Sequence, residues 1–325
     1  MKSPSQALQR SLVLLCLFLL SFASAAADWP SGPVKLVVGF TPGGPPDIIA
    51  RVLAQRLAAS GQPFIVENKP GASGTIGGNS VVRATPDGLT LLLGSSTFSA
   101  VNALYEKLPF DVDKDLAPVA MIGQTPLVLV VNANLPVQSV ADLVKLAKTR
   151  APNLTVASPG TGTTPHLAAE QFQQSAGIKL VHVPYKGSAP AMGDLLGGQV
   201  DLMFENAVTA LPHIRSGKLR ALAVTSATPY ADLPNVPTMA ASGFPDSAVA
   251  VWFGLFAPAK TPGATLDEIN AAINEVLRMP ETQAELSKLG LSVSIQSRDA
   301  FSALWRKDEK RFVKLVKERD IRLDH

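Results

Sequence analysis

The sequence predicts an α/β protein made of two doubly wound lobes that are joined by two crossover strands. Short β-branched runs alternate with helical patterns along the chain, which is the rhythm of a parallel sheet covered by helices. The rhythm occurs in two blocks, and two continuously apolar segments, Pro126–Asn132 and Val251–Pro258, bracket the second block. Because fully buried strands tend to be continuously apolar, we expect both segments to pass from one lobe to the other.

The first block contains three expected strands and two expected helices. After the first strand, apolar residues recur at helical spacing at Ile48, Ile49, Val52, Leu53 and Leu57, which predicts a helix with one buried face. The expected elements are, in chain order, strand Val34–Phe40, helix Asp47–Ser60, strand Phe64–Glu67, helix Ile76–Arg83 and strand Thr90–Leu93.

The second block repeats the pattern, and two more helices follow the second crossover. The expected elements are strand Leu154–Ala157, helix Pro165–Ser175, strand Lys179–Val183, helix Ala189–Leu196, strands Val200–Phe204 and Leu219–Val224, and helices Leu266–Arg278 and Ala300–Lys317. We therefore expect lobe 1 to comprise residues 28–126 and 252–325, and lobe 2 to comprise residues 127–251. The cleft between two hinged lobes is a typical ligand site.

Residues 1–27 have the features of a secretory signal peptide. Lys2 and Arg10 precede an apolar run over residues 12–22, and small residues follow it. The run is about half of the roughly 20 residues that a membrane span needs. We expect export with cleavage near Ala25–Asp28, and a short membrane anchor is the alternative.

Composition excludes several classes of site. Cys16 is the only cysteine and lies inside the apolar run, so the mature chain has no disulfide and no thiolate ligand. Cleavage removes Lys2 and Arg10 from 29 basic side chains and leaves all 26 acidic ones, so the mature chain is nearly neutral and we expect no nucleic-acid partner. The mixed charges of the C-terminal helix predict a solvated outer face.

Motifs for catalysis are weak. The four histidines are scattered without the paired spacing of a metal site, and the nearest match to a nucleophile elbow, Gly71–Thr75, lacks the last glycine. We therefore expect no metal, no cofactor and no enzymatic activity.

Two Gly-rich loops, one in each block, join a strand to a helix and are candidate anion sites. A helix N-terminus after a parallel strand favours an anion, and glycine frees the backbone N–H groups to point outward. The first loop contains Phe40, Thr41, Pro42, Gly43, Gly44 and Asp47, with Asp47 placed as the helix N-cap. A capped turn without a ligand is the alternative.

The second loop ends the Leu154–Ala157 strand and has the same arrangement. Its candidate residues are Ser158, Thr161, Gly162, Thr163, Thr164 and His166. The run lacks the third glycine of a dinucleotide motif and the lysine of a P-loop, so it does not indicate a nucleotide. Here too a capped turn is the alternative.

Other strand ends carry polar residues that should meet at the same edges of the sheets. These candidates are Ser95, Ser96 and Thr97 in the first block, and Tyr185, Lys186, Gly187, Glu205 and Asn206 in the second. Tyr185 would stack on a ligand or cover the sheet edge, and Lys186 would pair with an acid or remain solvated. Glu205 would select a ligand amine or cap the next helix.

Several long runs resemble the periplasmic solute-binding proteins of tripartite tricarboxylate transporters, the Bug or TctC family. They cover essentially the whole mature chain in the order found in that family. The runs are VVGFTPGGPPDIIARVLA, VENKPGASGTIGGNSVVRATPDGLTLLLG, VASPGTGTTPHLAAEQF, VPYKGSAPAMGDLLGGQVDLMFEN, LPHIRSGKLRALAVTS and WFGLFAPAKTP.

The resemblance implies a type II periplasmic-binding-protein fold that closes on a small carboxylate, such as a dicarboxylate, a tricarboxylate, an amino acid or an aromatic acid. The Phe40–Asp47 loop and Ser95–Thr97 would form the lobe-1 side of the site. The Ser158–His166 loop, Tyr185–Gly187 and Glu205–Asn206 would form the lobe-2 side. Trp252 would lie near the second crossover strand.

The resemblance also implies partners and a location. We expect a monomeric periplasmic protein that delivers its ligand to inner-membrane permease subunits. An exported sensing module that reports to a sensor kinase, and an exported α/β enzyme, are the alternatives. Glu205 is a departure, because many family members carry Asp at this turn, and it leaves the identity of the acid open.

Overall fold

The computed structural model describes residues 29–318 and 321, except positions 60, 62, 106 and 151. The predicted signal peptide, with Cys16 and the cleavage region Ala25–Asp28, lies outside the described residues. Among the residues that are described, no helix combines the length and apolar character that crossing a membrane requires.

Lobe 1 is built on three parallel strands in the order β2-β1-β3, namely β1 (Val34–Val38), β2 (Phe64–Asn68) and β3 (Thr90–Ser95). Most of β1 is buried, as expected for a strand with helices on both faces. The helices of this lobe are α2 (Pro45–Ala59), α3 (Thr75–Val82), α4 (Val101–Leu104), α5 (Val112–Asp115), α10 (Gly263–Arg278), α11 (Pro280–Lys288) and α12 (Arg298–Glu318).

Lobe 2 repeats the parallel arrangement, with β5 between β7 and β6. Its strands are β5 (Thr155–Ser158), β6 (Val181–Pro184), β7 (Leu202–Asn206) and β8 (Leu219–Val224). Its helices are α6 (Val140–Thr149), α7 (Thr164–Ala176), α8 (Ser188–Leu196) and α9 (Ala207–Arg215).

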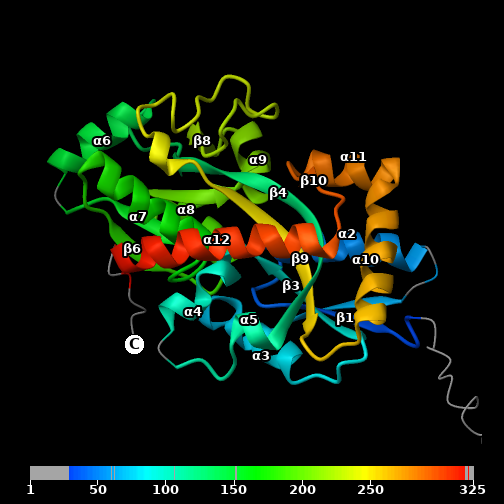
Figure 1. The fold of residues 1–325 in the computed structure, drawn as a ribbon. Coiled ribbons are helices and arrows are strands. Elements are labelled where there is room, and N and C mark those ends of the chain that lie inside the picture. The colour runs from blue at the N-terminus through cyan, green and yellow to red at the C-terminus, as the bar shows by residue number, and fades with distance from the viewer. Residues whose placement is uncertain are drawn as a thin grey trace, which may run out of the picture.

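Two long antiparallel strands, β4 (Leu116–Asn132) and β9 (Ala250–Pro258), connect the lobes and run side by side between them (Figure 1). β4 pairs with β9 as far as Pro126, and from Leu127 onward it pairs with β7 and β8. This change of partners is the geometry of a crossover strand. The boundaries that we expect for the lobes, residues 28–126 plus 252–325 and residues 127–251, remain a prediction.

The structure corrects several predicted elements. The first crossover begins at Leu116, ten residues before the predicted start at Pro126, because two register shifts let a strand that contains Pro118 stay paired with β9. The first helix begins at Pro45 and not at Asp47, since proline fits the first turn of a helix. Helices α4, α5, α6, α9 and α11 were not predicted.

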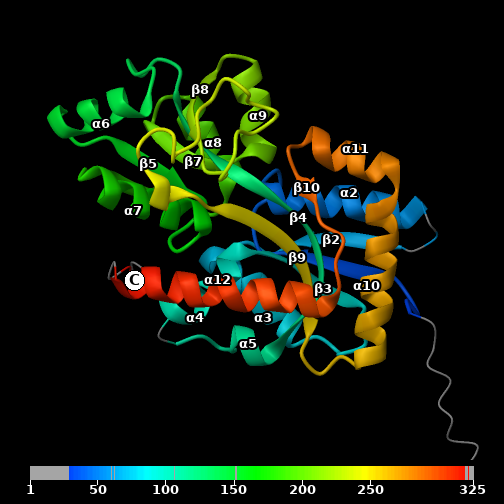
Figure 2. The same cartoon turned by 45° about the horizontal axis from the view of Figure 1, so that its top comes forward.

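The prediction that the C-terminal helix is a solvated outer face is only partly right. One face of α12 is buried through Phe301, Trp305, Phe312 and Val316, and most of its charged residues lie on the other face, although Asp308 turns toward Trp252. The helix packs on β4, on the turn that begins at Ser96 and on α4, and Figure 2 shows it extending from lobe 1 toward lobe 2.

Candidate functional site

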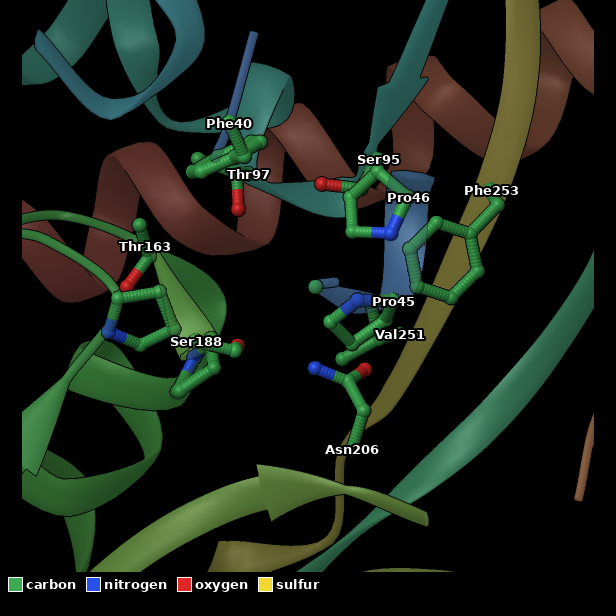
Figure 3. Close-up of a pocket in the computed structure, with 13 residues that line it drawn as sticks. Phe40, Pro45, Pro46, Ser95, Thr97, Thr163, Ser188, Asn206, Val251 and Phe253 are labelled. Atoms are coloured by element: carbon green, nitrogen blue, oxygen red, sulfur yellow. The ribbon is translucent and has the colours of Figure 1, made fainter. Parts of the chain in front are cut away.

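A cavity lies between the two lobes, and its empty space of about 370 Å³ includes solvent at its open mouth. Figure 3 shows hydroxyl groups and apolar rings from both lobes around this space. The lining residues are Phe40, Gly44, Pro45, Pro46, Ser95, Thr97, Pro159, Thr163, Pro165, Ser188, Asn206, Val251 and Phe253.

Six of the predicted binding residues line this cavity, and their contact with a ligand remains a prediction. They are Phe40, Gly44, Ser95, Thr97, Thr163 and Asn206. The other predicted residues hold the loops in place, join the lobes, lie at the rim or face away from the cavity.

The start of α2 differs from the predicted anion site. The N–H of Gly43 does not point outward to a ligand, because it donates to Asp47 Oδ2 at 2.9 Å. Asp47 is the third residue of the helix and not its N-cap, and it also accepts from Arg51 and Asn68. Burial alone would raise the pKa of the Asp47 carboxyl, but the bonds from Arg51, Gly43 and Asn68 outweigh it and lower the pKa.

The start of α7 repeats this arrangement with a different side chain. Gly162 N donates to His166 Nδ1 at 3.0 Å, just as Gly43 N donates to Asp47 four residues later. The His166 ring stacks on His182 at a centroid distance of 3.9 Å, and His182 Nε2 lies 2.7 Å from Ser158 Oγ. His166 and Ser158 therefore support the loop and do not line the cavity.

Hydrogen bonds beside the cavity join the lobes across the cleft. Ser96 Oγ lies 2.8 Å from Thr164 Oγ1, and Thr164 N donates to Thr97 Oγ1 at 3.3 Å. Ser73 Oγ donates to Thr161 O at 2.6 Å. The structure therefore shows the lobes in contact.

Glycines make two further interlobe approaches possible. A Cβ atom on Gly162 would overlap Leu104, and one on Gly187 would overlap the Thr41 hydroxyl. Both glycines have positive φ, of 78° and 149°, which favours glycine for a second reason. Gly162, Gly187 and Thr41 thus belong to the contact between the lobes.

Gly43, Tyr185 and Lys186 lie at the outer rim of the cleft and outside the cavity, and Pro42 is exposed and does not line it. Tyr185 Oη donates to Asp194 Oδ2 at 2.6 Å, and burial together with Asp194 raises the pKa of the phenol to about 12. The Lys186 side chain is exposed, as the solvated alternative expects.

Glu205 accepts hydrogen bonds at the start of the next helix, α9, whose N-cap residue is Asn206. Its Oε1 accepts from Asn206 N at 2.8 Å, from Thr209 Oγ1 at 2.7 Å and from Ser188 Oγ at 3.2 Å. The side chain is completely buried, burial raises the pKa of its carboxyl, and its Oε2 has no hydrogen-bond partner among the described residues.

Trp252 lies on the second crossover strand, β9, but its side chain does not line the cavity. Successive side chains of a strand point to opposite faces, and on β9 it is Val251 and Phe253 that line the cavity. The Trp252 ring instead packs edge-on against Phe301, and its Nε1 donates to Asp308 Oδ2 at 2.6 Å.

Seven lining residues were not named as candidates: Pro45, Pro46, Pro159 and Pro165, which lie within the two predicted loops, and Ser188, Val251 and Phe253, which lie outside them. The alternation of β9 could have identified Val251 and Phe253, and proximity to Gly187 could have identified Ser188. No cluster of three or more potential metal ligands occurs within the described ranges.

Two α/β lobes, two crossover strands and a small cavity lined from both lobes define the class of solute-binding proteins. Residues 49–321 match the family described as Tripartite tricarboxylate transporter family receptor, and the chain belongs to that family.

Known proteins of this family are similar along nearly the whole chain. Protein BugT of Bordetella pertussis is 37% identical over 321 residues, which are 97% of this chain and 98% of BugT. An R. palustris protein whose structure was solved with adipate is 35% identical with a TM-score of 0.87, and 91% of this chain and 100% of that chain are covered. MatC from Rhodopseudomonas palustris with bound malate is 32% identical with a TM-score of 0.85, covering 89% of this chain and 100% of MatC.

These structures confirm the predicted two-lobed fold and the predicted family. The family and the fold are those of binding proteins and not of enzymes.

Proposed function

We propose that this protein is exported to the periplasm, captures a small carboxylate between its lobes without transforming it, and delivers it to a tripartite tricarboxylate-type permease. The cavity between the lobes carries the proposal, because residues of both lobes line it. A ligand held there contacts both lobes only when they are together, so it stabilises the closed form.

Two similar proteins support the carboxylate. The R. palustris structure contains adipate and the MatC structure contains malate. The family description of a transporter receptor supports delivery to a permease, and the features of residues 1–27 support export.

The first test is thermal unfolding of the mature protein with a panel of organic acids and, as controls, neutral sugars of similar size. A ligand that binds only the folded state adds RT ln(1 + [L]/Kd) to its stability. At a concentration 100 times Kd this amounts to about 2.7 kcal/mol, which raises the melting temperature by several degrees. We expect a dose-dependent rise with at least one carboxylic acid and none with sugars.

A rise with sugars but with no acid would contradict the carboxylate ligand. Delivery is tested separately, by the uptake of the labelled acid in cells that lack this gene and in cells that regain it. We expect uptake to fall without the protein and to return with it; equal uptake in both strains would contradict a transport role.

A further inference from the structure

On the lobe-2 side of the cavity, two hydroxyl groups donate their hydrogens to acceptors within the protein. Thr163 Oγ1 donates to Gly160 O at 2.7 Å, and Ser188 Oγ donates to Glu205 Oε1 at 3.2 Å. A hydroxyl has one hydrogen and two lone pairs. These two side chains, which line the cavity, therefore offer a ligand lone pairs and no hydrogen.

Asn206 adds a further hydrogen-bond acceptor to the lobe-2 side. Its side-chain amide points into the space between the lobes (Figure 3), and its nitrogen faces Glu205 Oε1 at 3.4 Å. Its Oδ1 is buried and has no hydrogen-bond partner in the part of the chain that the structure describes. A buried acceptor without a partner costs free energy that a donor on the ligand would recover.

A protein carboxyl group already accepts hydrogen bonds at the helix starts on this side. Helix N-termini normally favour an anion. Glu205 Oε1 accepts from the N–H of Asn206, the N-cap of α9, and from the hydroxyl of Ser188, the first residue of α8. A second carboxylate from the ligand would meet Glu205 beside the same groups.

The lobe-1 side has the opposite balance. Thr97 Oγ1 accepts from Thr164 N, so its own hydrogen is left to donate, and the Ser95 hydroxyl also lies at the cavity. Both hydroxyls can therefore donate to a carboxylate.

An apolar wall adjoins these hydroxyls. Pro45 and Pro46, the first two residues of α2, have no N–H and present rings to the cavity, together with Val251 and Phe253. This wall suits the apolar body of a ligand and gives no partner to a second charge.

From this balance of donors and acceptors, we infer that the ligand is a monocarboxylate with a compact apolar body and one hydrogen-donating group, a hydroxyl or an ammonium. Its carboxylate meets Ser95 and Thr97, and its donor meets Thr163, Ser188 and Asn206. The inference rests on the proposed function and narrows it, because it disfavours dicarboxylates.

Four acids that differ at one position form a matched test: isovalerate, 2-hydroxyisovalerate, valine and isopropylmalonate. They share the carboxylate and the isopropyl body, and carbon 2 carries hydrogen, hydroxyl, ammonium or a second carboxylate. Their Kd values are measured by calorimetry on the mature protein. One net hydrogen bond changes Kd by about two- to tenfold, so we expect valine or 2-hydroxyisovalerate to bind more tightly than isovalerate by that factor, and isopropylmalonate to bind most weakly.

If isopropylmalonate or isovalerate binds as tightly as the better donor-bearing acid, the inference is overturned while the proposed function stands. If no acid of this set or of the wider panel binds, the proposed function itself fails. The hydroxyl and ammonium compounds decide which donor the site takes.

The variant Glu205→Gln tests the lobe-2 side. It removes the buried acid but keeps an oxygen that can accept from Asn206 and Ser188. We expect the Kd ratio of isopropylmalonate to the better donor-bearing acid to fall by at least about threefold, while the control Asp232→Asn, at a surface ion pair with Arg215, leaves it unchanged. An unchanged ratio in a folded Glu205→Gln protein would contradict the part assigned to Glu205.

Discussion

Asp47 and His166 each accept a hydrogen bond from the glycine four residues earlier, Gly43 or Gly162, and so fix the backbone at the edge of the cleft. Neither side chain lines the cavity. A carboxylate and an imidazole nitrogen thus do the same work at corresponding places in the two lobes. The residues that shape the site are partly ones that a ligand does not touch.

His182 makes the lobe-2 loop sensitive to pH. Burial, with a contribution from neighbouring His166, lowers the pKa of His182 from 6.5 to about 4. The unfolded chain therefore binds a proton at this residue below pH 6.5 that the folded protein excludes until about pH 4, so stability is present above pH 6.5 and is lost as the pH falls through that window.

We expect His182 to account for a loss of about 1–2 kcal/mol in the free energy of unfolding between pH 7 and pH 5. Urea unfolding of the wild type and of His182→Gln at both pH values measures it. The loss should be smaller in the variant; an equal loss in both proteins would show that other groups cause it.

At the scale of elements, strand β9 divides its side chains between two tasks. Val251 and Phe253 line the cavity, while Trp252 packs against Phe301 and binds Asp308. Burial raises the pKa of the Asp308 carboxyl, so the indole N–H is a partner that this group needs. One strand thus contributes side chains both to the cavity and to the contact that holds α12 in place.

Single substitutions at two neighbouring residues of β9 should separate the two tasks. Trp252→Phe removes the donor to Asp308 and should cost about 1–3 kcal/mol of stability with ligand affinity unchanged. Phe253→Leu keeps the strand apolar but reshapes the cavity wall, and should weaken ligand binding several-fold. Chemical unfolding and calorimetry measure the two effects, and loss of affinity in Trp252→Phe would contradict the assignment.

Periodicity in the sequence was sufficient for the elements with regular patterns. The strand at Val34 and the helix through Ile49 and Leu53 are where their patterns predict them. Helix α9 was not predicted because it contains Pro212, and the first part of β4 was not predicted because it contains Pro118. In both places tertiary pairing outweighs a local signal that argues against the element.

The site was predictable as a set of strand ends but not as a set of contacts. Sequence spacing placed Thr97 and Asn206 at the cavity, since parallel strands bring their ends to one edge. It did not show that Gly43 N–H is taken by Asp47, or that Pro45 and Pro46 rings stand where N–H groups were expected. Those facts depend on how each loop satisfies its own hydrogen bonds.

At the scale of the whole molecule, β4 and β9 make one sheet path continuous through both lobes. The loop from Gly160 to Thr164 makes several of the contacts between the lobes, because it meets Ser73, Ser96 and Thr97. The cavity lies beside these contacts, so a ligand and the closure of the lobes stabilise each other.

The most direct test of this account is a crystal structure of the mature protein with the tightest-binding acid of the panel. We predict the acid in the cavity between the lobes, with its carboxylate within hydrogen-bond distance of Ser95 and Thr97 and its body against Val251 and Phe253. An acid bound elsewhere on the protein, with this cavity left to solvent, would contradict it.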